Sequence, residues 1–171
     1  SFLGFDPVVS VSCKDKVVVV DNGTHQEIHT DKPYEVLRKL MKDYKSPRLS
    51  ELPPFTGGLV GYFSYSMIAY AEPVLKLRSS RFKDFELKLF DKLIAYDHLK
   101  QKIIIVVNMK TDKVLENYGK AVADIEKLTR LVMEADTSQV QVKSTVTKPD
   151  FGCNVSKEEF CWMVEKTKEY I

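Results

Sequence analysis

The first thirty residues alternate between β-rich apolar runs and short polar breaks. The runs are VVSVSC at 8–13, KVVVVD at 16–21 and QEIHT at 26–30. The dipeptides Lys14-Asp15 and Asn22-Gly23 separate them, and Asn-Gly favours a hairpin turn because both residues tolerate positive φ. The pattern therefore predicts β-strands joined by tight turns.

Three further stretches have strand character. GGLVGYFSY, at 57–65, is apolar and aromatic, and residues 84–97 predict one long strand or two in line. HLKQK then turns the chain, and IIIVVN, at 103–108, is predicted to return as an antiparallel partner. Because the apolar residues of this last run are consecutive, we expect both of its faces to be covered.

A helical period marks three other segments. The first begins at Asp31, its expected N-cap, with Pro33 in the first turn. The second covers residues 111–136, and the third begins at the capping box formed by Ser156 and Glu159. The expected core-facing residues are Leu37, Leu40, Met41 and Tyr44 in the first helix, Val114, Tyr118, Ala121, Val122, Ile125, Leu128 and Val132 in the second, and Phe160, Met163, Val164, Thr167 and Ile171 in the third.

Composition is that of a soluble globular domain, and the predicted strands and helices together indicate an α+β fold. Of the 171 residues, 44% are hydrophobic and 29% are charged, and the net charge of +2 is too small to indicate nucleic-acid binding. The longest apolar runs are far shorter than the roughly 20 residues that cross a bilayer. Three widely spaced cysteines, Cys13, Cys153 and Cys161, are expected to be reduced thiols in a cytoplasmic protein, and Cys153 and Cys161 are expected to be buried or half-buried.

The glycines of PPFTGGLVGYFSY, at 53–65, raise the possibility of a phosphate-binding loop. A Walker loop requires Lys and Ser or Thr directly after its glycines, and a dinucleotide fingerprint requires G-x-G-x-x-G between a strand and a helix. The spacing here is G-G-x-x-G, with prolines before it and aromatic residues after it. We therefore expect the glycines to permit close approach of a neighbouring backbone or large side chain, or to mark a bulge.

Candidate ligands and catalytic groups do not form a recognisable motif. His25 and His29 fall on a predicted strand, where four residues span roughly 13 Å, too far for one metal ion. His98 is expected in a solvated turn. The acidic residues Asp84, Glu86, Asp91 and Asp97 follow strand spacing without a visible point of convergence. We assign no catalytic, cofactor-binding or metal-binding residue.

Four ordered segments resemble anthranilate synthase component I, of the chorismate-utilising enzyme superfamily. They are SFLGFDP at 1–7, PPFTGGLVGYFSYSMIAYAEP at 53–73, FELKLFDKLIAYDHLKQKIIIVVN at 85–108, and SKEEFCWMVEKTKEYI at 156–171. The sequence departs from the family at Ser66, where Asp is usual, and in a short LRSSRFKD stretch at 77–84. The resemblance implies two packed, mostly antiparallel β-sheets with flanking helices, and glycines that serve sheet packing.

The resemblance also implies an activity for the complete enzyme. It converts chorismate and ammonia to anthranilate and pyruvate in tryptophan biosynthesis, using Mg²⁺. A glutamine amidotransferase subunit, component II, delivers the ammonia, and tryptophan inhibits allosterically. The resemblance implies a tryptophan pocket in the N-terminal part, between two packed β-sheets. The family's L-L-E-S and N-P-[ST]-P-Y-M motifs, which each supply part of that pocket, and its chorismate and Mg²⁺ ligands are expected outside residues 1–171.

On this basis residues 1–150 are predicted to be an N-terminal, regulatory-type region. Residues 151–171 are predicted to be the truncated start of the chorismate-binding region. The 171-residue chain alone is expected to be inactive, without a cofactor of its own. Two alternatives remain open: aminodeoxychorismate synthase component I, of the folate pathway, and a non-catalytic ligand-binding or docking module.

Overall fold

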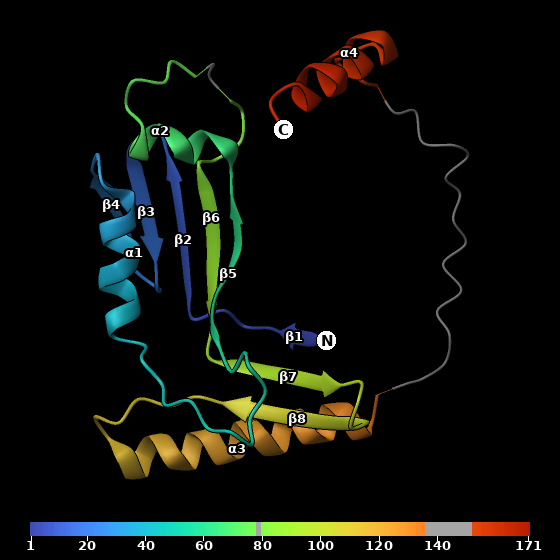
Figure 1. Ribbon diagram of the computed structural model, residues 1–171. Helices are drawn as coiled ribbons and strands as arrows, with labels where there is room; N and C mark the ends of the chain where they lie inside the picture. Colours follow the sequence, from blue (N-terminus) through green and yellow to red (C-terminus); the bar gives the residue numbers. More distant parts are fainter. Residues whose placement is uncertain (78–79, 136–151) are drawn as a thin grey trace. The chain divides into compact units, whose positions relative to one another are not determined.

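The computed structural model describes residues 1–77, 80–135 and 152–171 (Figure 1). The chain divides into two units, Ser1–Ala135 and Asp136–Ile171. The first contains two sheets and most of the helices, and the second contains one helix. The two units are described separately below.

The larger sheet of the first unit has five antiparallel strands in the order β4-β3-β2-β6-β5. Its strands are β2 (Val9–Lys14), β3 (Val17–Asp21), β4 (His25–His29), β5 (Gly58–Phe63) and β6 (Phe85–Phe90). Alternate residues of β2, β3 and β6 face a common core, in which the largest fully buried side chains are Phe85 and Leu89. Helix α1 (Pro33–Lys42) covers this face through Leu37 and the half-buried Leu40 and Met41, and Tyr44, just after the helix, packs against the same core.

The smaller sheet has the order β1-β7-β8, from β1 (Phe2–Gly4), β7 (Lys92–Asp97) and β8 (Lys102–Val107). Strand β6 continues into β7 with only Asp91 between them, so one extended segment passes from the larger sheet into the smaller (Figure 1). Helix α3 (Val114–Met133) lies along β8. The α+β class, with two mostly antiparallel sheets and flanking helices, is confirmed.

Short helical segments connect β5 to β6. These are η1 (Tyr65–Met67) and α2 (Ile68–Ala71), and Met67 is buried in the core of the larger sheet. The second unit contains α4 (Lys157–Lys168). The Ser156 hydroxyl accepts a hydrogen bond from the Glu159 backbone N–H at 3.1 Å, which confirms the predicted N-cap.

Gly61, within β5, and Gly57, just before it, have the steric role that the sequence predicted. A Cβ on Gly61 would lie 2.0 Å from the Glu86 carbonyl oxygen of the neighbouring strand, closer than any real contact. At Gly57, where φ is +141°, a Cβ would lie 2.8 Å from Asn108 Nδ2 and 2.9 Å from the Phe90 carbonyl oxygen. Both positions therefore require glycine for close packing against a strand or its flanking residues.

Several predicted details are wrong. Asp31 does not cap α1: Lys32 occupies the N-cap without a side-chain bond, because the Asp31 carboxylate pairs instead with Lys16 Nζ at 2.6 Å. The first turn falls at Asp15 and Lys16, one residue later than predicted.

The expected burial of α3, β8 and α4 is also only partly observed. In α3, Ala121 and Leu128 are buried but Tyr118 is 61% exposed, because a three-stranded sheet covers only one side of the helix. At the start of the edge strand β8, Ile103 is about half exposed. The predicted apolar face of α4 is exposed, because no second layer packs on it in the described part of its unit.

Candidate functional site

Two carboxylates, at opposite ends of β6, are the acidic groups that the fold removes most from solvent or places beside a groove. Asp84 immediately precedes β6 and is 6% exposed, and Asp91 immediately follows it. The other two acidic residues of this region have ordinary surface roles. Glu86 pairs with Lys83 Nζ at 2.9 Å, and Asp97 accepts bonds from the backbone N–H groups of the following turn.

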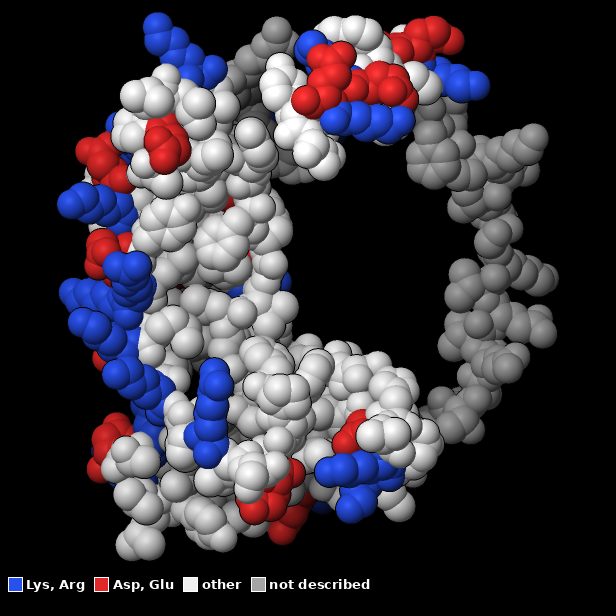
Figure 2. Space-filling model, viewed as in Figure 1, with Lys and Arg blue, Asp and Glu red and all other residues white. Residues whose placement is uncertain are grey.

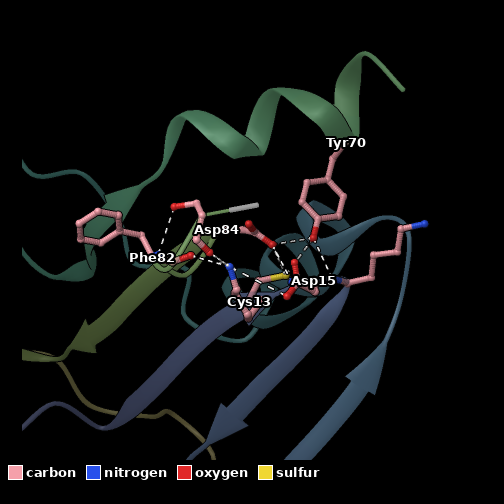
Figure 3. A network of polar contacts seen from close by, with 8 residues as sticks. Cys13, Asp15, Tyr70, Phe82 and Asp84 are labelled. Atoms are coloured by element: carbon pink, nitrogen blue, oxygen red, sulfur yellow. Dashed lines mark hydrogen bonds and ion pairs between the residues drawn. The ribbon is translucent and has the colours of Figure 1, made fainter. Parts of the chain in front are cut away.

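The Asp84 carboxylate is the centre of a network of polar contacts (Figure 3). Its Oδ2 atom accepts hydrogen bonds from the Tyr70 hydroxyl at 2.8 Å and from the Asp15 backbone N–H at 3.0 Å. The Cys13 thiol lies 3.9 Å from the same oxygen, which is a weak contact. These donors come from α2, from the β2–β3 turn and from β2, so one carboxylate joins three segments.

Backbone hydrogen bonds extend this network around Asp84. The Asp84 N–H donates to the Cys13 carbonyl oxygen and the Ser64 N–H donates to the Asp84 carbonyl oxygen, each at 2.8 Å. The Tyr70 hydroxyl also accepts from the Lys16 N–H at 2.9 Å, and Lys14 Nζ donates to the Phe82 carbonyl oxygen at 2.9 Å. The network therefore fixes α2 and the segment before β6 against the β2–β3 turn.

Protonation supports a structural role for this network. Burial raises the pKa of the Cys13 thiol, and burial together with the bonds to Cys13 and Asp84 raises the pKa of the Tyr70 hydroxyl. Both groups are therefore protonated at neutral pH and act as donors. A thiol with a raised pKa is a poor nucleophile, so the arrangement positions segments and does not activate a reactive group.

The other end of β6 opens into a groove of about 850 Å³. Asp91 lines it together with residues from the segment after α1, the start of β5 and the segment after β8. The Asn108 side chain braces one wall, because its Nδ2 donates to the Thr56 carbonyl oxygen at 2.7 Å and to the Asp91 carbonyl oxygen at 3.1 Å.

The Asp91 carboxyl group is incompletely paired. Its Oδ1 atom is shielded from solvent and receives no hydrogen bond from the described residues. Burial raises the pKa of Asp91, while the neighbouring Lys92 acts in the opposite direction. Lys92 itself pairs with Asp124 of α3, at 3.5 Å between Nζ and Oδ2.

The histidines and cysteines do not assemble into a site. His25 and His29 are the two ends of β4, as the strand prediction required, and His98 Nε2 lies 2.7 Å from the Ser1 hydroxyl. Cys13 is buried, whereas Cys153 and Cys161 are exposed free thiols, contrary to the prediction for these two. In residues 1–77, 80–135 and 152–171, no three His, Cys, Asp or Glu residues are grouped to hold a metal ion.

In the view of Figure 2, charged side chains of both signs lie mainly along one side of the first unit. Lys and Arg side chains gather over α1, which contains Arg38, Lys39 and Lys42 and one acidic residue, Glu35 (Figure 2). Arg38 pairs with Glu35 at 3.0 Å, as expected for a solvated helix face. None of the helices in the described ranges has both the length and the apolar character that crossing a membrane requires.

Comparison with known proteins identifies the family. The profile of the chorismate binding enzymes matches residues 3–171, and the chain belongs to this family. The chain is 33% identical to anthranilate synthase component 1 of Acetivibrio thermocellus, over all of this chain and 36% of that protein. It is 25% identical to aminodeoxychorismate synthase component 1 of Bacillus subtilis, again over all of this chain and 36% of that protein.

The fold has a counterpart among solved structures. The crystal structure of anthranilate synthase component I from Streptococcus pneumoniae TIGR4 superimposes with a TM-score of 0.67 at 23% identity, covering all of this chain and 38% of that one. The resemblance to anthranilate synthase component I is thus confirmed in sequence and in fold. The chain spans about a third of the length of these relatives.

Proposed function

We propose that this chain is the N-terminal, regulatory-type part of an anthranilate synthase component I. The complete enzyme would act in the cytoplasm, in tryptophan biosynthesis, and convert chorismate and ammonia to anthranilate and pyruvate. The observation that carries the proposal is the 33% identity to an anthranilate synthase component 1 over the whole chain. The order of the four family-like segments supports the same assignment.

The proposal includes Mg²⁺, a glutamine amidotransferase partner and inhibition by tryptophan for the complete enzyme. The described residues do not fit a magnesium site. Asp84 already accepts hydrogen bonds from protein donors, and Asp91 belongs to no group of three possible metal ligands among the described residues. The proposal therefore assigns the metal to other parts of the complete enzyme. It follows that the 171-residue chain alone should not turn over chorismate.

The competing assignment within the family is aminodeoxychorismate synthase component I, supported by the 25% identity to such a protein over the whole chain. A non-catalytic ligand-binding or docking module is the alternative outside enzyme chemistry.

One experiment separates these assignments. The complete parent polypeptide is incubated with chorismate, Mg²⁺ and ammonia, and anthranilate fluorescence is followed with and without tryptophan. Fluorescence that tryptophan suppresses supports the proposal. Chorismate consumption without fluorescence, giving a product that a lyase converts to 4-aminobenzoate, would establish the competing enzyme. Unchanged chorismate under both conditions would favour the non-catalytic module. The 171-residue chain, assayed in parallel, should give no product.

A further inference from the structure

The turn between β3 and β4 contains an asparagine followed by a glycine, Asn22-Gly23, at an edge of the larger sheet (Figure 1). Strand β3 ends at Asp21 and β4 begins at His25, and the residues between them are exposed. Within residues 1–77, 80–135 and 152–171, no atom lies within 4 Å of the place that a Cβ on Gly23 would take. Because glycine has no Cβ and nothing crowds it here, the Gly23 nitrogen is open to approach by the Asn22 side chain.

The side-chain amide of an asparagine can react with such a backbone nitrogen. The Gly23 nitrogen loses its proton, and its electron pair forms a bond to Asn22 Cγ. The bond between Cγ and Nδ2 breaks, and Nδ2 takes up the proton and leaves as ammonia, so a succinimide ring remains. Water then opens the ring, either at Cγ to give aspartate or at the backbone carbonyl carbon to give isoaspartate. The net reaction converts an amide and water to a carboxylate and ammonia.

The hydrogen bonds of the turn act on both reacting groups. Asn22 Oδ1 accepts from the Thr24 N–H at 3.3 Å, which holds the side-chain carbonyl in place and withdraws electrons from Cγ. Asn22 Nδ2, the leaving nitrogen, donates to none of the residues that the structure describes. The Gly23 N–H donates to the Asp21 carboxylate at 3.0 Å. Because a negative charge beside an N–H group disfavours loss of its proton, Asp21 slows the first step.

The other three asparagines of the chain lack this combination. The Nδ2 atom of Asn108 donates to two backbone carbonyl oxygens, at 2.7 and 3.1 Å. That of Asn117 donates to a backbone carbonyl oxygen at 3.0 Å and to a carboxylate at 2.9 Å. Asn154 is exposed, but the β-branched Val155 follows it and crowds the nitrogen that would attack. Of the four asparagines, Asn22 is the one that glycine follows.

We propose that Asn22 is a site of spontaneous deamidation in the folded protein, and that the Asp21 carboxylate restrains its rate. The reaction consumes only water, so it does not depend on the chorismate chemistry of the proposed function. Both products add a negative charge next to Asp21. Isoaspartate also lengthens the main chain of the turn and places the acceptor of the Thr24 N–H within it. The modification therefore changes the turn at an edge of the sheet.

The test compares the four asparagines within one sample. The folded 171-residue chain is incubated at mildly alkaline pH in water enriched in heavy oxygen, and samples taken over time are digested at acidic pH. Mass spectrometry measures the conversion of each amide to a carboxylate, and fragmentation distinguishes isoaspartate from aspartate. We expect conversion at Asn22 to be at least about tenfold faster than at Asn154, with isoaspartate among the products. Equal rates at these two positions, or aspartate as the sole product, would overturn the proposal.

Two substitutions that each remove one carboxylate test the part played by Asp21. Asp21→Ser removes the charge beside the Gly23 N–H and should raise the rate at Asn22 by about threefold or more in the folded chain. The increase should be smaller in concentrated guanidinium chloride, where the turn is not formed. Glu27→Gln is the matched control, because Glu27 is exposed and lies within β4, opposite Val19, and it should change the rate by less than about twofold. An unchanged or lower rate in Asp21→Ser, an equal increase in Glu27→Gln, or the same increase in denaturant would contradict restraint by Asp21.

Discussion

Replacement of Tyr70 by Phe tests whether the polar network around Asp84 stabilises the fold. The substitution removes one hydroxyl group and keeps the ring. It deletes the 2.8 Å bond to the Asp84 carboxylate and the 2.9 Å bond from the Lys16 N–H. Asp84 would keep the Asp15 N–H and the weak thiol contact, while the exposed Lys16 N–H can bond to water.

The expected magnitude follows from these partners. A hydrogen bond to a charged group contributes about 1.5–3 kcal/mol to the free energy of unfolding, and the Tyr70–Asp84 bond is partly buried. We therefore expect Tyr70→Phe to lower the free energy of unfolding by about 2 kcal/mol. Tyr34→Phe is the matched control, because the Tyr34 hydroxyl makes only a 3.5 Å contact with the Met67 carbonyl oxygen and should lose less than about 0.5 kcal/mol.

Urea unfolding of the 171-residue chain, followed by far-UV circular dichroism and tyrosine fluorescence, provides the assay. The single tryptophan, Trp162, lies in α4 of the second unit, so tyrosine fluorescence is followed for the first unit. A double-mutant cycle with Asp84→Asn should give a coupling energy of about 1 kcal/mol or more. Equal effects of Tyr70→Phe and Tyr34→Phe, or a coupling energy near zero, would refute the reasoning.

The remaining predictions concern backbone geometry and the pH dependence of stability. Gly61→Ala, whose Cβ would lie 2.0 Å from the Glu86 carbonyl oxygen, should lower the free energy of unfolding by about 3 kcal/mol or more, or prevent folding. Gly119→Ala, whose Cβ would meet nothing within 4 Å, should raise it by about 0.5–1 kcal/mol. Urea unfolding compares the two variants, and similar effects would contradict the packing argument. Lys16→Gly, at φ +70°, should raise the free energy of unfolding by up to about 1 kcal/mol in the same assay, and a loss of 1 kcal/mol would show that its exposed pair with Asp31 matters more than the turn. Because the pKa of Asp91 is raised in the folded state, its contribution to stability falls as pH rises from the ordinary value of 3.8 through the folded-state pKa. The free energy of unfolding, measured against pH, should show this fall in the native chain and not in Asp91→Asn. Curves of the same shape for the two proteins would exclude the contribution of Asp91.

The sequence predicts the elements well because local chemistry decides them. Asn22-Gly23 and Ser156 mark a turn and a helix start through bonds within a few residues, and the structure has both. Gly61 was assigned to close packing because neither phosphate motif fitted its spacing. Asp31 failed as an N-cap because a neighbouring strand supplies Lys16, and a pairing between segments does not follow from helix propensity.

The candidate sites lay beyond sequence reasoning for a related reason. Asp84 and Asp91 are separated by six residues of one alternating strand, and nothing in that spacing shows which carboxylate receives donors. The partners of Asp84 lie 14 and 69 positions away, in α2 and in the β2–β3 turn. The sequence does contain one indication of these sites, because each carboxylate stands at an end of an apolar strand, where the chain leaves a packed layer. Such positions favour contacts with residues that are distant in the sequence.

The two ends of β6 give carboxylates of opposite character, and stability can separate them. Asp84 is surrounded by donors that the protein supplies, so Asp84→Asn should destabilise the fold, because it replaces the charged acceptor of the Tyr70 hydroxyl and the Asp15 N–H by a neutral amide. Asp91 Oδ1 receives no hydrogen bond from the described residues, so Asp91→Asn should not destabilise the fold. Equal destabilisation by the two substitutions would contradict this contrast between the two carboxylates.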